Sequence, residues 1–263
     1  MATIYRYEGG RVEPLEGETV SEVPLLVTVN GQELATLIAS PHDLRFLVAG
    51  FLRLQGFVAS VDDFLMLSVC NDSGMANVRV RGEVPSRLTP VLTSGCGTGI
   101  TFHLPEARHA APGAEGGDER RFTPGEVFAL MDELARRAEG YRRHGGIHSA
   151  AVGDGNSLLL YAEDIGRHNT LDRIAGEALL KNIDLKGGML VTSGRVSVEM
   201  VAKALLLGIT LIASRTAPTD MAVRMGEEAG ATIVGYVRGG RFNVYTHPER
   251  LGISATPGIS PCD

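Results

Sequence analysis

The sequence predicts an α/β protein in which a smaller mixed α+β module precedes a larger domain built on a largely parallel sheet. In the C-terminal half, short apolar segments alternate with segments whose apolar residues recur at helical spacing, which is typical of a sheet covered by helices on both faces. In residues 1–103, pairs of β-rich segments joined by turn residues flank one helical pattern. The chain has 263 residues, of which 44% are hydrophobic, enough for one large domain or two small ones.

Composition narrows the classes of function. The chain has 25 Lys and Arg residues against 31 Asp and Glu residues, a net charge of −6, so we expect no general affinity for nucleic acid. No apolar run is long enough to span a bilayer, and the first residues lack the apolar stretch of a secretory signal. Three cysteines are too few for a disulfide framework or a zinc site. We therefore expect a cytoplasmic protein without a membrane partner.

Residues 1–103 contain the elements of the smaller module. Two β-rich segments surround Asn30 and Gly31, a pair that favours a tight hairpin because both residues tolerate positive φ angles. A helix is expected next, with Pro41 at its first position. Its buried face comprises Leu44, Leu47, Val48 and Phe51. Two further strands, over residues 64–69 and 75–81, flank a turn.

A break in the pattern separates the module from the larger domain. Residues 104–122 lose all periodicity and are rich in Ala, Gly, Pro and charge, which favours a flexible linker. A surface loop inside a single domain fits the same residues about equally well. Residues 251–263 are expected to form a disordered tail, so the larger domain is assigned to residues 123–250.

The larger domain is predicted to begin with a helix capped by Thr123, with Glu126 completing a capping box. Strands and helices then alternate. We expect strands over residues 157–161, 189–192, 210–213, 232–236 and 242–246, and helices over residues 167–180, 196–207 and 218–229.

Four loops of this domain combine small residues with arginine. Ligands of open α/β sheets bind beyond the carboxyl ends of the strands, and the loops expected there span residues 163–169, 192–195, 214–220 and 236–241. Gly, Ser and Thr let backbone N–H groups approach a ligand, and guanidinium groups add the charge that a phosphate requires. Neither common glycine-rich nucleotide motif is present. For one loop alone, pairing of its arginine with a surface carboxylate is the simpler explanation; four such loops in series favour a phosphate site.

Cys96 stands among glycines in the segment TSGCGTG, residues 93–99. Small, flexible neighbours expose a sulfur and let backbone amides stabilise the nucleophilic thiolate. Such a thiol suits attack on another sulfur and relay through a persulfide, although a loop cysteine without a chemical role is about equally probable from the residues alone. Cys70, at the end of an apolar strand, is expected in the core, and Cys262 has no expected role.

Two histidines and two carboxylates are further candidates. His148 and His168 each lie near a predicted element start, where an imidazole can act as an acid, a base or a phosphate donor. A structural role is the simpler reading for His148. The carboxylates of Glu163 and Asp164 either cap the helix that follows or hold a ligand hydroxyl or guanine edge, and capping is the cheaper explanation.

Together these motifs resemble the FdhD family, the formate dehydrogenase accessory sulfurtransferases. The resemblance covers nearly the whole chain except its ends and residues 104–122. It rests on the strings EDIGRHN (163–169), TSGR (192–195), APTD (217–220), YVRGGR (236–241) followed by FNVYT (242–246), and on EVPL (22–25) and VNG (29–31) near the start.

The resemblance implies a function. Members of this family receive sulfur from a cysteine desulfurase as a cysteine persulfide and pass it to the molybdenum or tungsten bis(molybdopterin guanine dinucleotide) cofactor, which formate dehydrogenase requires. It also implies a homodimer, a C-terminal three-layer domain similar to cytidine deaminases but without their zinc ligands, and GDP as a surrogate ligand. By this resemblance the persulfide residue is Cys96, and the family's cofactor-binding segment is Tyr236, Val237, Arg238, Gly239, Gly240 and Arg241.

We add the neighbouring loops to the expected cofactor site, namely Gly166, Arg167, His168, Ser193, Gly194 and Arg195. One departure from the family matters: many members carry a second cysteine in the loop, where this chain has Gly99. A disulfide relay within the loop is therefore excluded, whereas a single persulfide is not. The alternative hypothesis is a chaperone that binds and delivers the cofactor without sulfur chemistry. Neither the metal nor the recipient dehydrogenase follows from the sequence.

Overall fold

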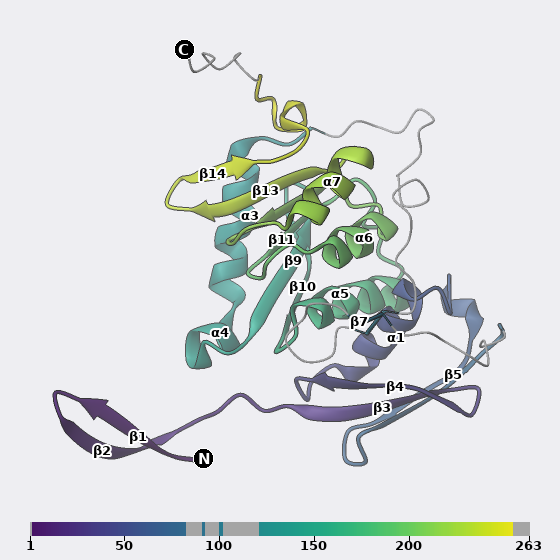
Figure 1. The fold of residues 1–263 in the computed structure, drawn as a ribbon. Helices are drawn as coiled ribbons and strands as arrows, with labels where there is room; N and C mark the ends of the chain where they lie inside the picture. The colour runs from purple at the N-terminus through teal and green to yellow at the C-terminus, as the bar shows by residue number, and fades with distance from the viewer. Residues whose placement is uncertain (1, 83–90, 93–99, 102–120, 255–263) are drawn as a thin grey trace.

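In the N-terminal module, one helix packs on a four-stranded sheet (Figure 1). The structure is a computed structural model that describes residues 2–82, 91–92, 100–101 and 121–254. The elements of the module are β3 (Val23–Val29), β4 (Gln32–Ala39), α1 (Leu44–Leu54), β5 (Phe64–Cys70) and β6 (Met75–Val80), with the strand order β4-β3-β6-β5. Asn30 and Gly31 join β3 to β4 with φ angles of 51° and 83°, so the predicted hairpin is confirmed.

Two predictions about this module are wrong. The helix begins at Leu44 instead of Pro41, after Asp43, which has a left-handed φ of 44°. Hydrogen bonds from the larger domain hold the backbone of residues 40 and 42 outside the helix. Cys70 is exposed instead of buried. Its neighbour Val69 packs into the core under α1, and alternation along the strand turns Cys70 to the opposite face.

The larger domain contains a mixed six-stranded sheet. Its strands are β9 (His148–Gly153), β10 (Leu158–Asp164), β11 (Met189–Thr192), β12 (Leu211–Ser214), β13 (Thr232–Arg238) and β14 (Arg241–Val244), in the order β10-β9-β11-β12-β13-β14. Only the pairs β11–β12 and β12–β13 are parallel. The expectation of a largely parallel sheet is therefore wrong, because β9–β10 and β13–β14 are hairpins, whose short turns require antiparallel strands. The strand β9 consists mostly of small residues, which give a weak strand signal.

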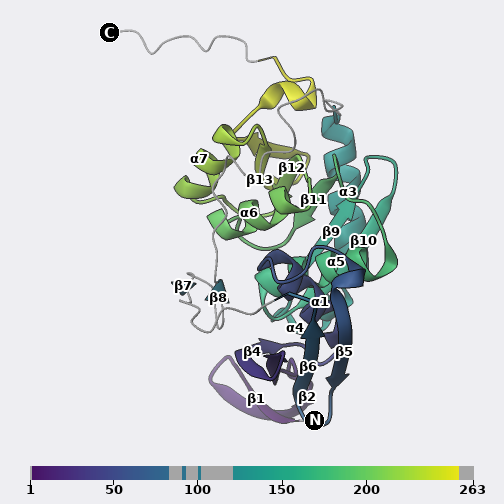
Figure 2. The ribbon, with the colours of Figure 1, turned by 90° about the vertical axis from the view of Figure 1, so that its right-hand side faces the viewer.

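Helices cover both faces of this sheet, which gives three layers (Figure 2). On one face lies α3 (Pro124–Arg137), and on the other lie α5 (Arg167–Lys181), α6 (Val198–Leu206) and α7 (Asp220–Glu228). Alternate residues separate the two cores: Val152 packs with α5 and α6, whereas Ala151 packs with α3. The predicted capping box of Thr123 and Glu126 is confirmed. The predicted helices and strands of this domain lie within three residues of the observed ones. The likeness to cytidine deaminases stays a prediction.

The helices α1 and α5 join the two parts of the chain through direct backbone contact. A Cβ atom on Gly50 of α1 would overlap the carbonyl oxygen of Asp172, and one on Gly176 of α5 would overlap that of Phe46. The cores also interlock, since Leu179 of α5 packs in the core of the N-terminal module and Leu54 of α1 in that of the larger domain. The module is therefore packed directly against the larger domain and shares core residues with it.

Smaller elements complete the described chain. A ribbon of β1 (Ala2–Glu8) and β2 (Arg11–Gly17) precedes the module, and α4 (Glu139–His144) follows α3 (Figure 1). The remaining elements are η1 (Val61–Asp63), β7 (Val91–Leu92), β8 (Ile100–Thr101) and η2 (Pro248–Leu251). Leu251 is buried against the α3 side of the sheet, so the larger domain extends beyond the expected boundary at residue 250. No helix in the described ranges is long and apolar enough to cross a membrane.

Candidate functional site

The loops singled out from the sequence meet at one edge of the six-stranded sheet. In the strand register, Asp164 at the end of β10 lies opposite His148 at the start of β9, and Thr192 at the end of β11 lies beside Ser214 at the end of β12. The backbone N–H of Tyr236 in β13 donates to the carbonyl oxygen of Thr216 at 3.0 Å, which brings the fourth loop to the same edge. The expected convergence of the loops is confirmed.

Gly194 lies at the centre of this edge. A Cβ atom there would lie 2.9 Å from Cβ of Arg167 and 3.4 Å from Nδ1 of His148. Its own groups are held in place: the Gly194 N–H donates to Oγ1 of Thr192 at 3.1 Å, and its carbonyl oxygen accepts from Oγ of Ser214 at 2.7 Å. A glycine is therefore required where these loops approach each other.

Ser193 and His148 form a polar pair beside Gly194. The Ser193 Oγ accepts from the backbone N–H of Ser149 at 3.0 Å and lies 3.4 Å from Nδ1 of His148. Burial, followed by the charge of Arg167, lowers the pKa of His148 below its ordinary value. The imidazole is thus neutral near pH 7, and this pair can donate or accept a hydrogen bond without placing another charge at the edge.

A cavity of about 690 Å³ opens between this edge and the helices α3 and α4. One wall is apolar and includes Met131, Leu134 and Ile147. The polar part of the lining comprises His148, Ser149, Ser193, Arg215, Thr216 and Arg238. Tyr141 and Arg142 of α4 also line it, and sequence reasoning missed them because a six-residue helix gives almost no periodic signal. An apolar wall facing convergent polar groups is typical of a small-molecule site.

The arginines of this edge decide between the two explanations left open by the sequence. Arg215, Arg238 and Arg241 form no ion pair with any carboxylate in the part of the chain that the structure describes. Among the residues that the structure describes, the alternative that these three arginines pair with surface carboxylates therefore has no support. Two of them, Arg215 and Arg238, face the cavity. Guanidinium groups beside a cavity that pair with no carboxylate of the described residues favour an anionic ligand.

The segment from Tyr236 to Arg241 has an unusual backbone. Tyr236 has a φ of 58°, in the left-handed region that a bulky residue rarely occupies, at an irregularity in the β13–β14 pairing. Its half-exposed ring lies 5.7 Å from the guanidinium carbon of Arg238. Gly239 and Gly240, with φ angles of 57° and 71°, form the turn before β14. Val237 differs from its neighbours, since its side chain is buried in the α3-side core and only its backbone faces the loop.

His168 lies on the opposite face of the sheet from the cavity, among buried charges. Its Nε2 is 3.2 Å from Oε2 of Glu199 and 3.3 Å from Oγ of Ser197. Lys203 continues the cluster, with its Nζ 3.5 Å from Oε1 of Glu199 and 2.8 Å from Oδ1 of Asp172. Burial, followed by the positive charges of Lys203 and Arg167, lowers the pKa of His168 to about 2. This residue does not line the cavity, which leaves its expected contact with a ligand unsupported.

The two carboxylates before α5 have structural partners. The carboxylate of Glu163 accepts from the backbone N–H groups of Gly140 and Tyr141 at 3.1 and 3.2 Å, so it holds the start of α4 and not that of α5. Asp164 is fully buried, and its Oδ1 accepts from Gly166 N–H at 2.9 Å. Capping of α5 was the cheaper explanation for these residues, but α5 has no side-chain cap, and the Asp164 carboxylate also accepts from Nδ2 of Asn169 at 2.8 Å and pairs with Arg173.

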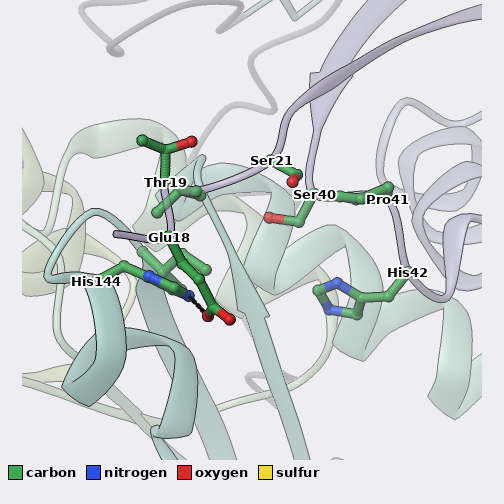
Figure 3. Close-up of a pocket in the computed structure, with 9 residues that line it drawn as sticks. Glu18, Thr19, Ser21, Ser40, Pro41, His42 and His144 are labelled. Carbon is green, nitrogen blue, oxygen red and sulfur yellow. Dashed lines mark ion pairs between the residues drawn. The ribbon is translucent and has the colours of Figure 1, made fainter. Parts of the chain in front are cut away.

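A second cavity, of about 510 Å³, lies between residues 18–21, the segment from Ser40 to His42, and α4 (Figure 3). Its lining includes His42 and His144 but no arginine or lysine, so it lacks the charge that a phosphate needs. Glu18 on its wall is paired with Arg143, with 2.7 Å between Oε2 and Nη2. Within the described ranges, no group of three or more His, Cys, Asp or Glu side chains is arranged to hold a metal ion. Cys96, Gly99 and Cys262 lie outside the described residues.

The fold and the edge define a mixed α/β protein with an arginine-lined cavity at the carboxyl ends of its central strands. The FdhD/NarQ family model matches residues 20–252, and the chain belongs to that family. It is 35% identical to the sulfur carrier protein FdhD of Bacillus subtilis over 254 residues, which cover 94% of this chain and 95% of that protein. The Staphylococcus aureus (strain Newman) protein of the same name is 34% identical over 252 residues, 94% of each chain.

A crystal structure shows the same fold. It is that of a formate dehydrogenase accessory protein from Desulfotalea psychrophila, which matches this structure with a TM-score of 0.77 at 25% identity. The match covers 95% of this chain and 98% of that chain. The family expected from the sequence motifs is thus confirmed, and so is the mixed α/β fold.

Proposed function

We propose that this chain carries sulfur, as a persulfide on Cys96, from a cysteine desulfurase to a molybdenum or tungsten bis(molybdopterin guanine dinucleotide) cofactor during maturation of formate dehydrogenase. Relatives that cover most of the chain at about 35% identity are named sulfur carriers, which supports the sulfur-transfer part. The cofactor part depends on one observation, the cavity of about 690 Å³ whose polar lining includes two arginines, Arg215 and Arg238, that pair with no carboxylate of the described residues.

The cavity fits one nucleotide end of such a substrate. The guanidinium groups of Arg215 and Arg238 supply positive charge for a diphosphate, and the hydroxyls of Ser149, Ser193 and Thr216 supply hydrogen bonds. The apolar wall of α3 offers a surface for a flat base. Arg241 and the turn at Gly239 and Gly240 extend this basic edge beyond the cavity. GDP, which has the same base and diphosphate, is the surrogate ligand for binding measurements.

The sulfur steps balance without an added reagent. In the first, the Cys96 thiolate attacks the terminal sulfur of the desulfurase persulfide; a new S–S bond forms on Cys96, and the desulfurase thiolate leaves. In the second, the terminal sulfur passes to the substrate's metal and the Cys96 thiolate is released. That sulfur gains two electrons as it becomes sulfide, and the metal, rising from the +4 to the +6 state, supplies them. One cysteine suffices, so Gly99 is compatible with this sequence of steps.

Mass spectrometry after incubation with a desulfurase and cysteine tests the proposal. Wild-type protein is expected to gain the mass of one sulfur atom on the peptide that contains Cys96, and the Cys96→Ala variant is expected to gain none and to leave formate dehydrogenase inactive. Cys70→Ala is the matched control, because Cys70 is an exposed thiol in the same module and should be dispensable. Maturation of active formate dehydrogenase by Cys96→Ala would refute the persulfide role.

A cofactor chaperone without sulfur chemistry is the second candidate. The observation that favours it is Gly99, which stands where many family members have a second cysteine. The same experiment separates the two functions, since a chaperone would bind GDP and support maturation without any gain of sulfur on Cys96. Full GDP affinity in Cys96→Ala is expected under both hypotheses and serves as the check that the variant is folded.

A further inference from the structure

The N-terminal module holds a loop of the candidate site through three hydrogen bonds. The segment between β4 and α1 reaches residues 164–169 of the larger domain. The Ser40 N–H donates to Oδ2 of Asp164 at 3.3 Å, and the Ile165 N–H donates to Oγ of Ser40 at 3.2 Å. Nδ2 of Asn169 donates to the carbonyl oxygen of Ile38 at 2.9 Å. Figure 3 shows Ser40 and His42 where this segment borders the second cavity.

A buried ion pair fixes the same segment. Arg173 of α5 donates from Nε and Nη2 to Oδ2 of Asp164 at 2.8 and 2.6 Å. Its guanidinium group also donates to the carbonyl oxygen of Ser40 at 2.7 Å and to that of His42. Because the other oxygen of Asp164 accepts from the Gly166 N–H at 2.9 Å, one carboxylate positions both the module segment and the loop of the site.

The loop held in this way leads directly into the packed edge. Arg167 follows Gly166, and its Cβ lies against Gly194, where a side chain would have only 2.9 Å. The glycine contact between α1 and α5 prevents the module from sliding independently of this loop. Hydrogen bonds and packing contacts therefore connect Ser40, through residues 165–167, to Gly194 at the ligand edge.

We propose that Ser40 is a positioning residue of the candidate site: the N-terminal module sets the place of residues 165–167, and occupancy of the cavity is coupled to the position of that module. Thermodynamic coupling is reciprocal, so a ligand at the edge also restrains the segment around Ser40. The use of GDP as the probe rests on the proposed function. The positioning role of Ser40 does not depend on the proposed function, because it is argued from hydrogen bonds within the chain.

Hydrogen exchange of the ligand-free protein tests the positioning role. Ser40→Ala removes the acceptor of the Ile165 N–H, and we expect that amide to exchange about fivefold faster, as for loss of one hydrogen bond of ordinary strength. The matched control is Thr28→Ala, which deletes a hydroxyl of the same module that contacts the carbonyl oxygen of Ala76 at 3.2 Å. The control should leave exchange at Ile165 unchanged. In a second measurement, calorimetry with GDP should show about fivefold weaker binding for Ser40→Ala alone.

The outcomes separate this inference from the proposed function. Unchanged exchange at Ile165 in Ser40→Ala would overturn the positioning role, as would faster exchange spread evenly over β3, β4 and α1, which is the signature of a purely structural residue. Equal GDP affinity of wild type and Ser40→Ala would overturn the coupling. If wild-type protein does not bind GDP, the proposed cofactor site is wrong, while the exchange measurement still decides the role of Ser40.

Discussion

The N-terminal part of the chain is attached to the larger domain in two places that differ in kind. At the α1–α5 contact, helices meet backbone to backbone, and Arg173 of α5 donates to the carbonyl oxygen of Ser40 at 2.7 Å while it pairs with Asp164 of its own domain at 2.6 Å, both side chains of the pair being almost fully buried. At the base of the β1–β2 ribbon, Arg143 pairs with Glu18 at 2.7 Å, but both side chains are more than half exposed. Each pair joins an arginine to a carboxylate, Asp164 in the first and Glu18 in the second, and the surroundings of the two pairs differ.

This difference shows why a short distance does not measure the importance of an ion pair. Water competes for the exposed pair, and such pairs contribute at most about 1 kcal/mol to stability. The buried pair has no water to replace a missing partner, so removing one side leaves an unpaired buried charge, which costs about 3–5 kcal/mol. The ribbon is correspondingly independent of the body, with Tyr5 and Tyr7 exposed, whereas the module shares its core residues with the larger domain.

The largest effect is expected from filling the α1–α5 contact. Gly176→Val would place side-chain atoms on the carbonyl oxygen of Phe46, and no rotamer avoids that overlap. We expect a loss of more than about 4 kcal/mol in the free energy of unfolding, measured by urea denaturation, or no folded protein. Gly125→Ala in α3 is the control, because a Cβ there meets nothing nearer than 3.8 Å. Near-native stability of Gly176→Val would mean that the helices do not touch.

An intermediate effect is expected from breaking the two ion pairs by the same substitution. Arg173→Met should lower the free energy of unfolding by about 3–5 kcal/mol, because the carboxylate of Asp164 stays buried without its partner. Arg143→Met removes the partner of Glu18 at the ribbon and should cost less than about 1 kcal/mol. Urea denaturation of both variants provides the comparison. Equal losses would contradict the distinction drawn between buried and exposed attachments.

Sequence patterns predicted most elements but not the joint between the two parts. The strand over residues 189–192 and the helix capped by Thr123 follow from local signals, apolar runs and capping residues. The contact of Gly50 with α5 joins residues more than a hundred positions apart and has no local signal. The start of α1 was wrong for the same reason, since Arg173, far along the chain, holds its preceding segment.

The candidate site was predictable to a similar extent. Loops that follow successive strands meet because of sheet geometry, so the gathering of Ser193, Gly194 and Arg238 at one edge could be expected from the sequence. The contribution of α4 to the cavity could not be predicted from the sequence, because this helix is too short for a periodic pattern. The direction of the His168 side chain could not be predicted from the sequence either. At a helix start a histidine can face the ligand or the neighbouring helix, and here it faces Glu199 of α6.

A smaller effect than that of Arg173→Met concerns proton binding by His168, which extends the contrast between buried and exposed charges. Burial lowers the pKa of His168 from its ordinary value of 6.5 to about 2. Between these two pH values, His168 is therefore protonated in the unfolded chain but neutral in the folded chain. Stability from this group is therefore complete above pH 6.5 and falls as the pH falls toward 2, by roughly 2 kcal/mol at pH 5. His42 and His148, whose pKa values are also lowered, act in the same direction.

In His168→Asn the fall in unfolding free energy between pH 7 and 5 should be smaller than in wild type by about 2 kcal/mol. Urea denaturation at the two pH values measures it, and parallel losses in both proteins would show that His168 takes up its proton in the folded state as readily as in the unfolded one.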